Sequence, residues 1–348
     1  MGDALMRMAL SSGTPSSAAV LKSLLALSSL HRSGLHVQSI NLKIESLGAL
    51  RVASKSELGV KELIQHVAAG MLLCSFEVQQ SSCTSSQWMC YITGVKGVLS
   101  STRLRPCHQD SDFNALKQWV YYHDVLARFT MRHWDPAAYT FCVMMRSNMT
   151  QFMSSECIPS SQSKPSILTI LKLLSEVCQT VASRPQATKS GQQSDDYKSY
   201  LEVLDWRVRN IPIPSKDDET PAMVAIIELY KLAISVYLYR ATENLLDQSV
   251  RTQKQIERGF TLFSQLDSCE RQFPVLILGC EARTDDQRAI ILDLIARTEC
   301  KMSSRSFNHV SLVLAALWAQ DDLADGELNY WDKLTSIISS CEILPSLV

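Results

Sequence analysis

Apolar residues recur at the spacing of an α-helix along most of the chain. In the first such stretch Val20, Leu24 and Leu27 follow one another three or four positions apart, which places them on one face of a helix. The most apolar stretch begins at Pro221, and proline is favoured at the first position of a helix. The pattern predicts helices over 16–31, 37–53, 56–79, 85–101, 112–129, 167–182, 196–209, 221–246, 250–266, 273–282, 284–299, 304–321 and 328–341.

A strand is suggested at one place only. Residues 273–280 form a short apolar run that would also suit a buried strand, but no second run of that kind exists to pair with it. Glycine and proline are scarce, at 12 and 11 residues, whereas all-β folds use both in many tight turns. We therefore expect an all-α fold of about a dozen helices, packed as an irregular array or an α-solenoid-like domain.

The same pattern gives a simple domain organisation. Residues 1–15 are expected to be a flexible N-terminus, and residues 16–348 a single domain. Two long loops are expected near 131–165, which is rich in serine, methionine and aromatic residues, and near 183–195, which is polar. A loop of about 35 residues is uncommon inside a compact domain, so the first could hide a short helix or act as a lid.

Two glycines lie inside the predicted helix 85–101. Gly94 and Gly97 each weaken a helix by up to about 1 kcal/mol relative to alanine. The simplest compensation is the close approach of a neighbouring helix, which we therefore expect at these two positions.

Composition and charge narrow the classes of function. The 348 residues are 46% hydrophobic and 20% charged, which suits a large buried core and excludes disorder for most of the chain. The net charge is −1, and no basic face of the kind that binds phosphates is visible, so we expect no direct contact with nucleic acid. The stretch 221–241 contains Glu228, Lys231 and Arg240, which argues against a membrane span.

Eleven cysteines raise the question of a metal site. No two of them stand at the Cys-x2-Cys spacing of structural zinc sites, so no metal and no cofactor are expected. Several lie in apolar runs, as Cys74 does, where a free thiol behaves as a small hydrophobic group. No secretory signal is recognised, which indicates a reducing compartment. Phosphate-binding glycine loops and nucleophile elbows are also absent from the sequence.

One segment gathers aromatic and titratable side chains. Trp119, Tyr122 and His123 share a helical face, and a histidine beside an oriented tyrosine could act as an acid or a base. The alternative is a packed face whose histidine bonds a backbone carbonyl, and this alternative is favoured. An acidic segment at 319–327 lacks the order of a calcium loop and is interpreted as a helix end, with Trp318 and Trp331 beside it in packing roles.

Several segments occur in an order that is typical of one family. They are 26–31, 71–78 with Trp88 and 91–97, 119–127, 273–282 with Asp286 and Arg288, and 317–321 with Trp331. Together they resemble the fungal-specific transcription factor domain, the regulatory region of many zinc-cluster regulators, including sterol-responsive ones. The resemblance covers residues 16–341. It implies an all-α domain with a role in transcriptional control. It implies no catalytic residues in this sequence.

The chain departs from this family's usual pattern in one respect. Its members normally carry an N-terminal cluster of six cysteines and two zinc ions that places a helix in the DNA major groove, and this sequence contains none. Three explanations stay open: a truncated gene model, a regulator that acts through partners, or a domain put to another use.

The favoured hypothesis is a nuclear transcriptional regulator without its own DNA-binding domain. It would act through protein partners or a small apolar effector, with control of a specialised-metabolite gene cluster as one role, and a homo-oligomer and a cytoplasmic location stay open. The alternatives are an enzyme, a cyclase or isomerase that uses Tyr122 and His123, and a scaffold that only binds proteins. The residues considered for a ligand pocket are Trp88, Trp119, Tyr122, His123, Trp318 and Trp331.

Overall fold

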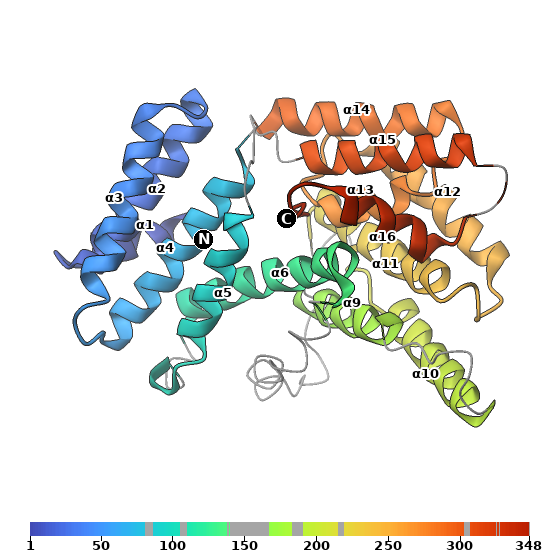
Figure 1. Ribbon diagram of the computed structural model, residues 1–348, viewed down its shortest axis with the longest axis horizontal. Coiled ribbons are helices and arrows are strands. Elements are labelled where there is room, and N and C mark those ends of the chain that lie inside the picture. The colour runs from blue at the N-terminus through green and yellow to red at the C-terminus, as the bar shows by residue number, and fades with distance from the viewer. Residues whose placement is uncertain are drawn as a thin grey trace. The chain divides into compact units, whose positions relative to one another are not determined.

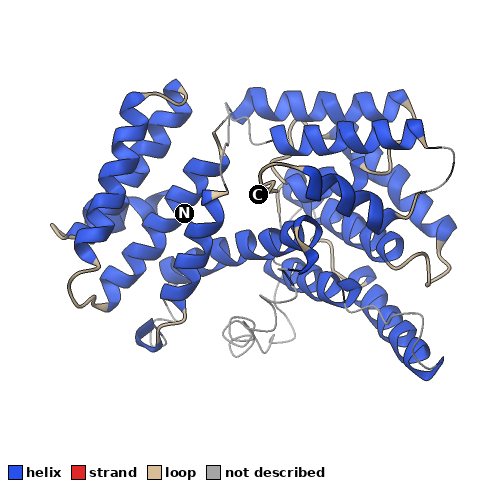
Figure 2. Cartoon of the chain, in the orientation of Figure 1, coloured by secondary structure: helices blue, strands red, loops and turns tan. Residues whose placement is uncertain are grey.

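The computed structural model describes an all-α protein. It covers residues 1–80, 86–104, 110–137, 139, 167–182, 191–214, 219–302, 307–324, 326 and 328–347. These residues form fourteen helices and no strand (Figure 2). The predicted fold class is therefore confirmed. In the strand-like run 273–280, residues 273–279 belong to a buried helix and Cys280 follows its end.

The chain divides into two compact units. The first unit contains residues 1–124 among those described. Its helices are α1 (Gly2–Leu10), α2 (Pro15–Ser33), α3 (Val37–Ala53), α4 (Val60–Val78), α5 (Gln87–Leu99) and the first half of α6 (Ser111–Trp134). Helix α2 packs against α1, α3 and α4, and α4 packs against α5 (Figure 1). The single domain over 16–348 stays a prediction.

The N-terminus differs from the flexible segment that we expected. Residues 2–10 form α1, which buries Ala4, Leu5 and Ala9 against the first unit. The Arg7 Nη2 atom lies 2.7 Å from a carboxylate oxygen of Asp112, at the start of α6. The stretch is too short to show a clear period, and its ion-pair partner stands 105 positions further along the chain.

The glycines of α5 also differ from expectation. Nothing lies within 4 Å of a Cβ built on Gly94 or Gly97, so neither marks a close helix approach. The close approach is at Gly70 of the facing helix, where a Cβ would stand 2.4 Å from Val95 Cγ2. The prediction that α5 meets a neighbour closely was right about the helix pair and wrong about which helix supplies the glycine.

The second unit contains the remaining described residues from Val125 onward, with the second half of α6. Its other helices are α9 (Ile167–Ala182), α10 (Gly191–Arg209), α11 (Pro221–Ala241), α12 (Ser249–Gln265), α13 (Gln272–Gly279), α14 (Asp285–Met302), α15 (Asn308–Leu323) and α16 (Tyr330–Ser340).

Helix α11 is central to the second unit, since it packs against α9, α10, α12, α13 and α16 (Figure 1). The Thr220 hydroxyl caps it by accepting from Met223 N at 3.3 Å, and Pro221 follows at its first turn. Among the described helices it alone is long and apolar enough to cross a membrane, and 61% of its most apolar window is buried inside the protein. Burial in a protein core accounts for such a composition equally well.

The two predicted long loops are only partly described. Helix α6 continues to Trp134, so residues 131–134 are helical rather than part of a loop. Residues 140–166 lie outside the described residues. Helix α10 begins at Gly191, five residues earlier than predicted, and the rest of the second loop, 183–190, also lies outside the described residues.

The contact at Gly70 predicts the effect of two alanine substitutions. Gly70→Ala is expected to destabilise the protein by about 1–3 kcal/mol, because the new methyl group must displace the stiff Val95 side chain. Gly94→Ala, which meets open space within a helix, is expected to stabilise it by up to about 1 kcal/mol. Urea unfolding of both variants measures the difference, and equal effects would contradict the packing described here.

Candidate functional site

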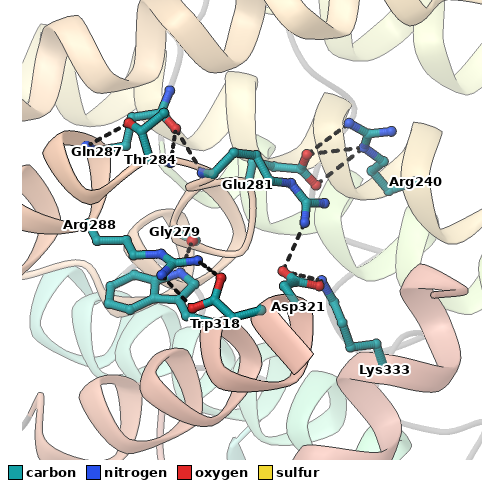
Figure 3. A network of polar contacts seen from close by, with 11 residues as sticks. Arg240, Gly279, Glu281, Thr284, Gln287, Arg288, Trp318, Asp321 and Lys333 are labelled. Carbon is teal, nitrogen blue, oxygen red and sulfur yellow. Dashed lines mark hydrogen bonds and ion pairs between the residues drawn. The ribbon is translucent and has the colours of Figure 1, made fainter. Parts of the chain in front are cut away.

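The second unit contains a charged network that joins the ends of five helices. It consists of Arg240, Glu281, Arg283, Arg288, Asp321, Asp322 and Lys333 (Figure 3). Glu281 follows α13 and has a side chain only 2% exposed. Its carboxylate accepts hydrogen bonds from Arg240 Nε at 3.2 Å and from Arg240 Nη2 at 2.8 Å. A buried charge needs such a partner, so this pair fixes the end of α11 against the end of α13.

Asp321 is the second anchor of the network. Its carboxylate oxygens lie 2.7 Å and 2.9 Å from Lys333 Nζ, and the Lys333 side chain is only 3% exposed. Arg283 Nη1 reaches the same carboxylate at 2.9 Å. The three residues come from α15, α16 and the turn before α14, so one carboxylate connects three elements (Figure 3).

Trp318 completes the connection between α13 and α15. Its Nε1 donates to the Gly279 carbonyl oxygen at 2.9 Å, which satisfies an acceptor at the end of α13. A Cβ on Gly279 would lie 2.9 Å from the Leu314 side chain, so the two helices meet closely. Arg288 stands with its Cζ 5.7 Å from the Trp318 ring and pairs with Asp322 at 2.7 Å. Trp318 therefore has the packing role that the sequence favoured.

A buried histidine cluster lies elsewhere in the same unit. His133 is fully buried, with Nδ1 2.9 Å from Thr335 Oγ1 and Nε2 3.1 Å from the Tyr237 hydroxyl. The rings of Phe129 and Trp331 lie 5.1 Å and 4.3 Å from its ring, measured between centroids. Burial, with the nearby Arg132 charge, lowers the pKa of His133 to about 3. The imidazole is therefore neutral and joins α6, α11 and α16.

The aromatic segment of α6 adopts the favoured alternative. His123 Nδ1 lies 3.0 Å from the Trp119 carbonyl oxygen, one helical turn earlier. Its ring meets those of Trp119 and Tyr122 edge to face, at 6.0 Å and 5.5 Å. Tyr122 and His123 are buried, and Trp88 of α5 is buried completely.

The six residues considered for a ligand pocket divide between the two units. The first unit holds Trp88, Trp119, Tyr122 and His123, and the second holds Trp318 and Trp331. The structure brings Trp119, Tyr122 and His123 into one ring cluster, while Trp318 and Trp331 belong to the charged network and to the histidine cluster respectively. A pocket lined by these side chains stays a prediction.

Sequence reasoning missed Arg132 and His133, because their segment was assigned to a loop. Phe129 and His133 stand four positions apart on one face of α6, and this spacing could have extended the helix. The partner Thr335 is 202 positions away and leaves no local signal.

Within the described residues, no group of three or more histidine, cysteine, aspartate or glutamate side chains is placed to hold a metal ion.

A family model for the fungal specific transcription factor domain matches residues 2–340, nearly the whole chain. The chain belongs to this family. The resemblance proposed from its motifs is thereby confirmed. A relative described as transcription factor iacI, from Pestalotiopsis fici, is 44% identical over 347 residues, which are 99% of this chain and 88% of the relative. No solved structure matches the chain.

Membership of the fungal-specific transcription factor domain family makes this chain a transcriptional regulator. Two segments that carried the resemblance, 273–282 and 317–321, meet through the hydrogen bond from Trp318 to the Gly279 carbonyl oxygen. Each also supplies a carboxylate to the charged network, Glu281 and Asp321. These residues hold helix ends together, which is a structural role.

Neighbouring carboxylates of the network offer a matched pair of variants. Asp321→Ala leaves the buried Lys333 ammonium without its carboxylate and is expected to destabilise the protein by about 3–5 kcal/mol. Asp322→Ala removes a carboxylate that is 57% exposed and is expected to change stability by about 1 kcal/mol or less. Urea unfolding compares the two. Recovery of stability in Asp321→Leu combined with Lys333→Met would support the assignment, and equal losses in the two single variants would contradict it.

The low pKa of His133 predicts that the folded protein loses stability in acid. The unfolded chain protonates this histidine below about pH 6.5, whereas the folded chain does so only near pH 3. Between these values the unfolded state binds more protons, so stability falls as the pH falls. The loss between pH 6.5 and 4.5 is expected to be about 2 kcal/mol.

Urea unfolding at several pH values tests this expectation. His133→Gln is expected to flatten the pH profile over that interval, while His31→Gln, at an exposed position, should reproduce the wild-type profile. An unchanged slope in His133→Gln would show that other groups cause the acid sensitivity.

Proposed function

We propose that this chain controls transcription through partner proteins, a small apolar effector, or both, rather than by binding DNA itself. The main support for the proposal is the family match over residues 2–340, because nearly the whole chain matches a domain found in transcription factors. The 44% identity to a relative described as a transcription factor supports the same role. The net charge of −1 supports action through partners, since phosphate-binding domains carry a basic face.

The effector part of the proposal is supported by the buried polar groups of the second unit. A regulator responds to a small molecule only if two of its states bind that molecule unequally. The charged network and the histidine cluster join helices of this unit through a few specific hydrogen bonds. Breaking one of these bonds would therefore alter how the helices that it joins are held together.

The genes that we propose as targets form a specialised-metabolite cluster, and the proposed location is the nucleus. A strain that lacks this chain is expected to lose or gain transcripts of a small group of neighbouring genes, while most transcripts stay constant. Sequencing of total RNA from the deletion strain and its parent measures this effect.

Complementation supplies the control for that experiment. The wild-type chain, fused to a fluorescent protein, should restore the transcripts and accumulate in nuclei, and the unstable Asp321→Ala chain should restore them poorly. Exclusion from nuclei together with unchanged transcripts would overturn the proposal.

A further inference from the structure

Arg132 is a buried cation without a described counter-ion. The residue is 2% exposed, and its guanidinium is charged at every pH that proteins tolerate. Its Nη2 donates to the Tyr139 hydroxyl at 2.6 Å, and its Cζ stands 4.6 Å from the Tyr139 ring centroid. The Nε and Nη1 atoms are buried and have no hydrogen-bond partner in the described part of the chain. Among the described residues, two of the three nitrogen atoms of this charged group therefore lack an acceptor.

The described groups around this guanidinium supply no negative charge. Cys178 of α9 and Tyr237 of α11 interact with Arg132 electrostatically and through side-chain hydrogen bonds. Burial raises the pKa of Cys178, and it raises the pKa of Tyr237 well above 10, so both are protonated and neutral near pH 7. His133, beside Arg132 in the chain, is neutral as well because its pKa is about 3.

Arg240 shows how the same unit treats a cation that serves only structure. Arg240 is 30% exposed at its side chain and is paired with the Glu281 carboxylate through two of its nitrogen atoms. Arg132 is more deeply buried and has a phenol in place of a carboxylate. An unpaired buried charge is strongly unfavourable, and proteins tolerate such groups mainly where a ligand completes them.

We propose that Arg132 is the anchor of an effector site that binds an apolar molecule carrying a carboxylate. The carboxylate would accept hydrogen bonds from the Arg132 donors that lack partners, and such charge-assisted bonds are among the strongest in proteins. The body of the molecule would contact aromatic surroundings, since the Tyr237 ring lies 5.3 Å from that of Phe129. The inference rests on the proposed function, in which a small effector sets the activity of the regulator.

Binding of simple acids to the purified full-length chain tests the site. Decanoate and naphthoate, each compared with its methyl ester at equal concentration, serve as probes in thermal unfolding. The acids are expected to raise the melting temperature and the esters to raise it less, because an ester cannot supply the negative charge. An equal effect of acid and ester, or no effect of either, would overturn the carboxylate class, and this comparison needs no variant.

Two matched arginine variants locate the binding. Without a probe, Arg132→Met is expected to raise the melting temperature, since it removes an unpaired buried charge. Arg240→Met is expected to lower it, because Glu281 then loses its partner. With a probe, Arg132→Met should bind the acids roughly tenfold or more weakly and lose the preference for acid over ester.

A carboxylate within the chain would produce the opposite result. Glu156 is the one acidic residue of 140–166, which lie outside the described residues. If Arg132→Met lowers the melting temperature as Arg240→Met does, and Glu156→Gln repeats that loss, the counter-ion is internal and the effector site is refuted. This test measures binding and not transcripts, so a negative result would not contradict the proposed function. Conversely, unchanged transcripts in the deletion strain would not contradict binding of the acids.

Discussion

The structure of the second unit depends on one constraint: a charge in the protein interior is strongly unfavourable unless an opposite charge compensates it. Glu281 and Lys333 are both almost completely buried, and each has a single well-placed partner, Arg240 and Asp321. Apolar packing alone lets helices slide by small amounts, because one methyl group can replace another. A buried ion pair allows no such shift, since any displacement leaves a charge uncompensated. The two pairs therefore fix the relative positions of α11, α13, α15 and α16.

The fold could be predicted from sequence to the extent that local periodicity determines it. Helices with a clear apolar face and a defined start, such as α11 after Thr220, were found within a few residues of their observed bounds. Helix α1 was missed because its nine residues are too few to establish a period, and because it is held by contacts with distant residues such as Asp112. The end of α6 was missed because Arg132 and His133 look like surface residues, yet both are buried.

The candidate site shows a sharper limit. The motifs at 273–282 and 317–321 were recognised as characteristic of a family, but nothing in them says why those residues are required. The reason lies in pairs that are far apart in sequence: Arg240 with Glu281 is separated by 41 positions and Trp318 from Gly279 by 39. Among the residues that the sequence offered as pocket lining, His123 bonds the Trp119 carbonyl and Trp318 the Gly279 carbonyl. Arg132, whose Nε and Nη1 atoms have no partner among the described residues, carried no sequence signal.

The composition of α11 has a consequence for synthesis of the chain on the ribosome. This helix is long and apolar enough to resemble a membrane segment, and α12, α13 and α16, which cover part of it, all follow it in the sequence. A nascent chain that has emerged only as far as Ala241 therefore presents this surface to the factors that sort proteins co-translationally. Two processes then compete. The ribosome must add about a hundred further residues before the later helices can cover α11, and the sorting factors can recognise the apolar helix until then.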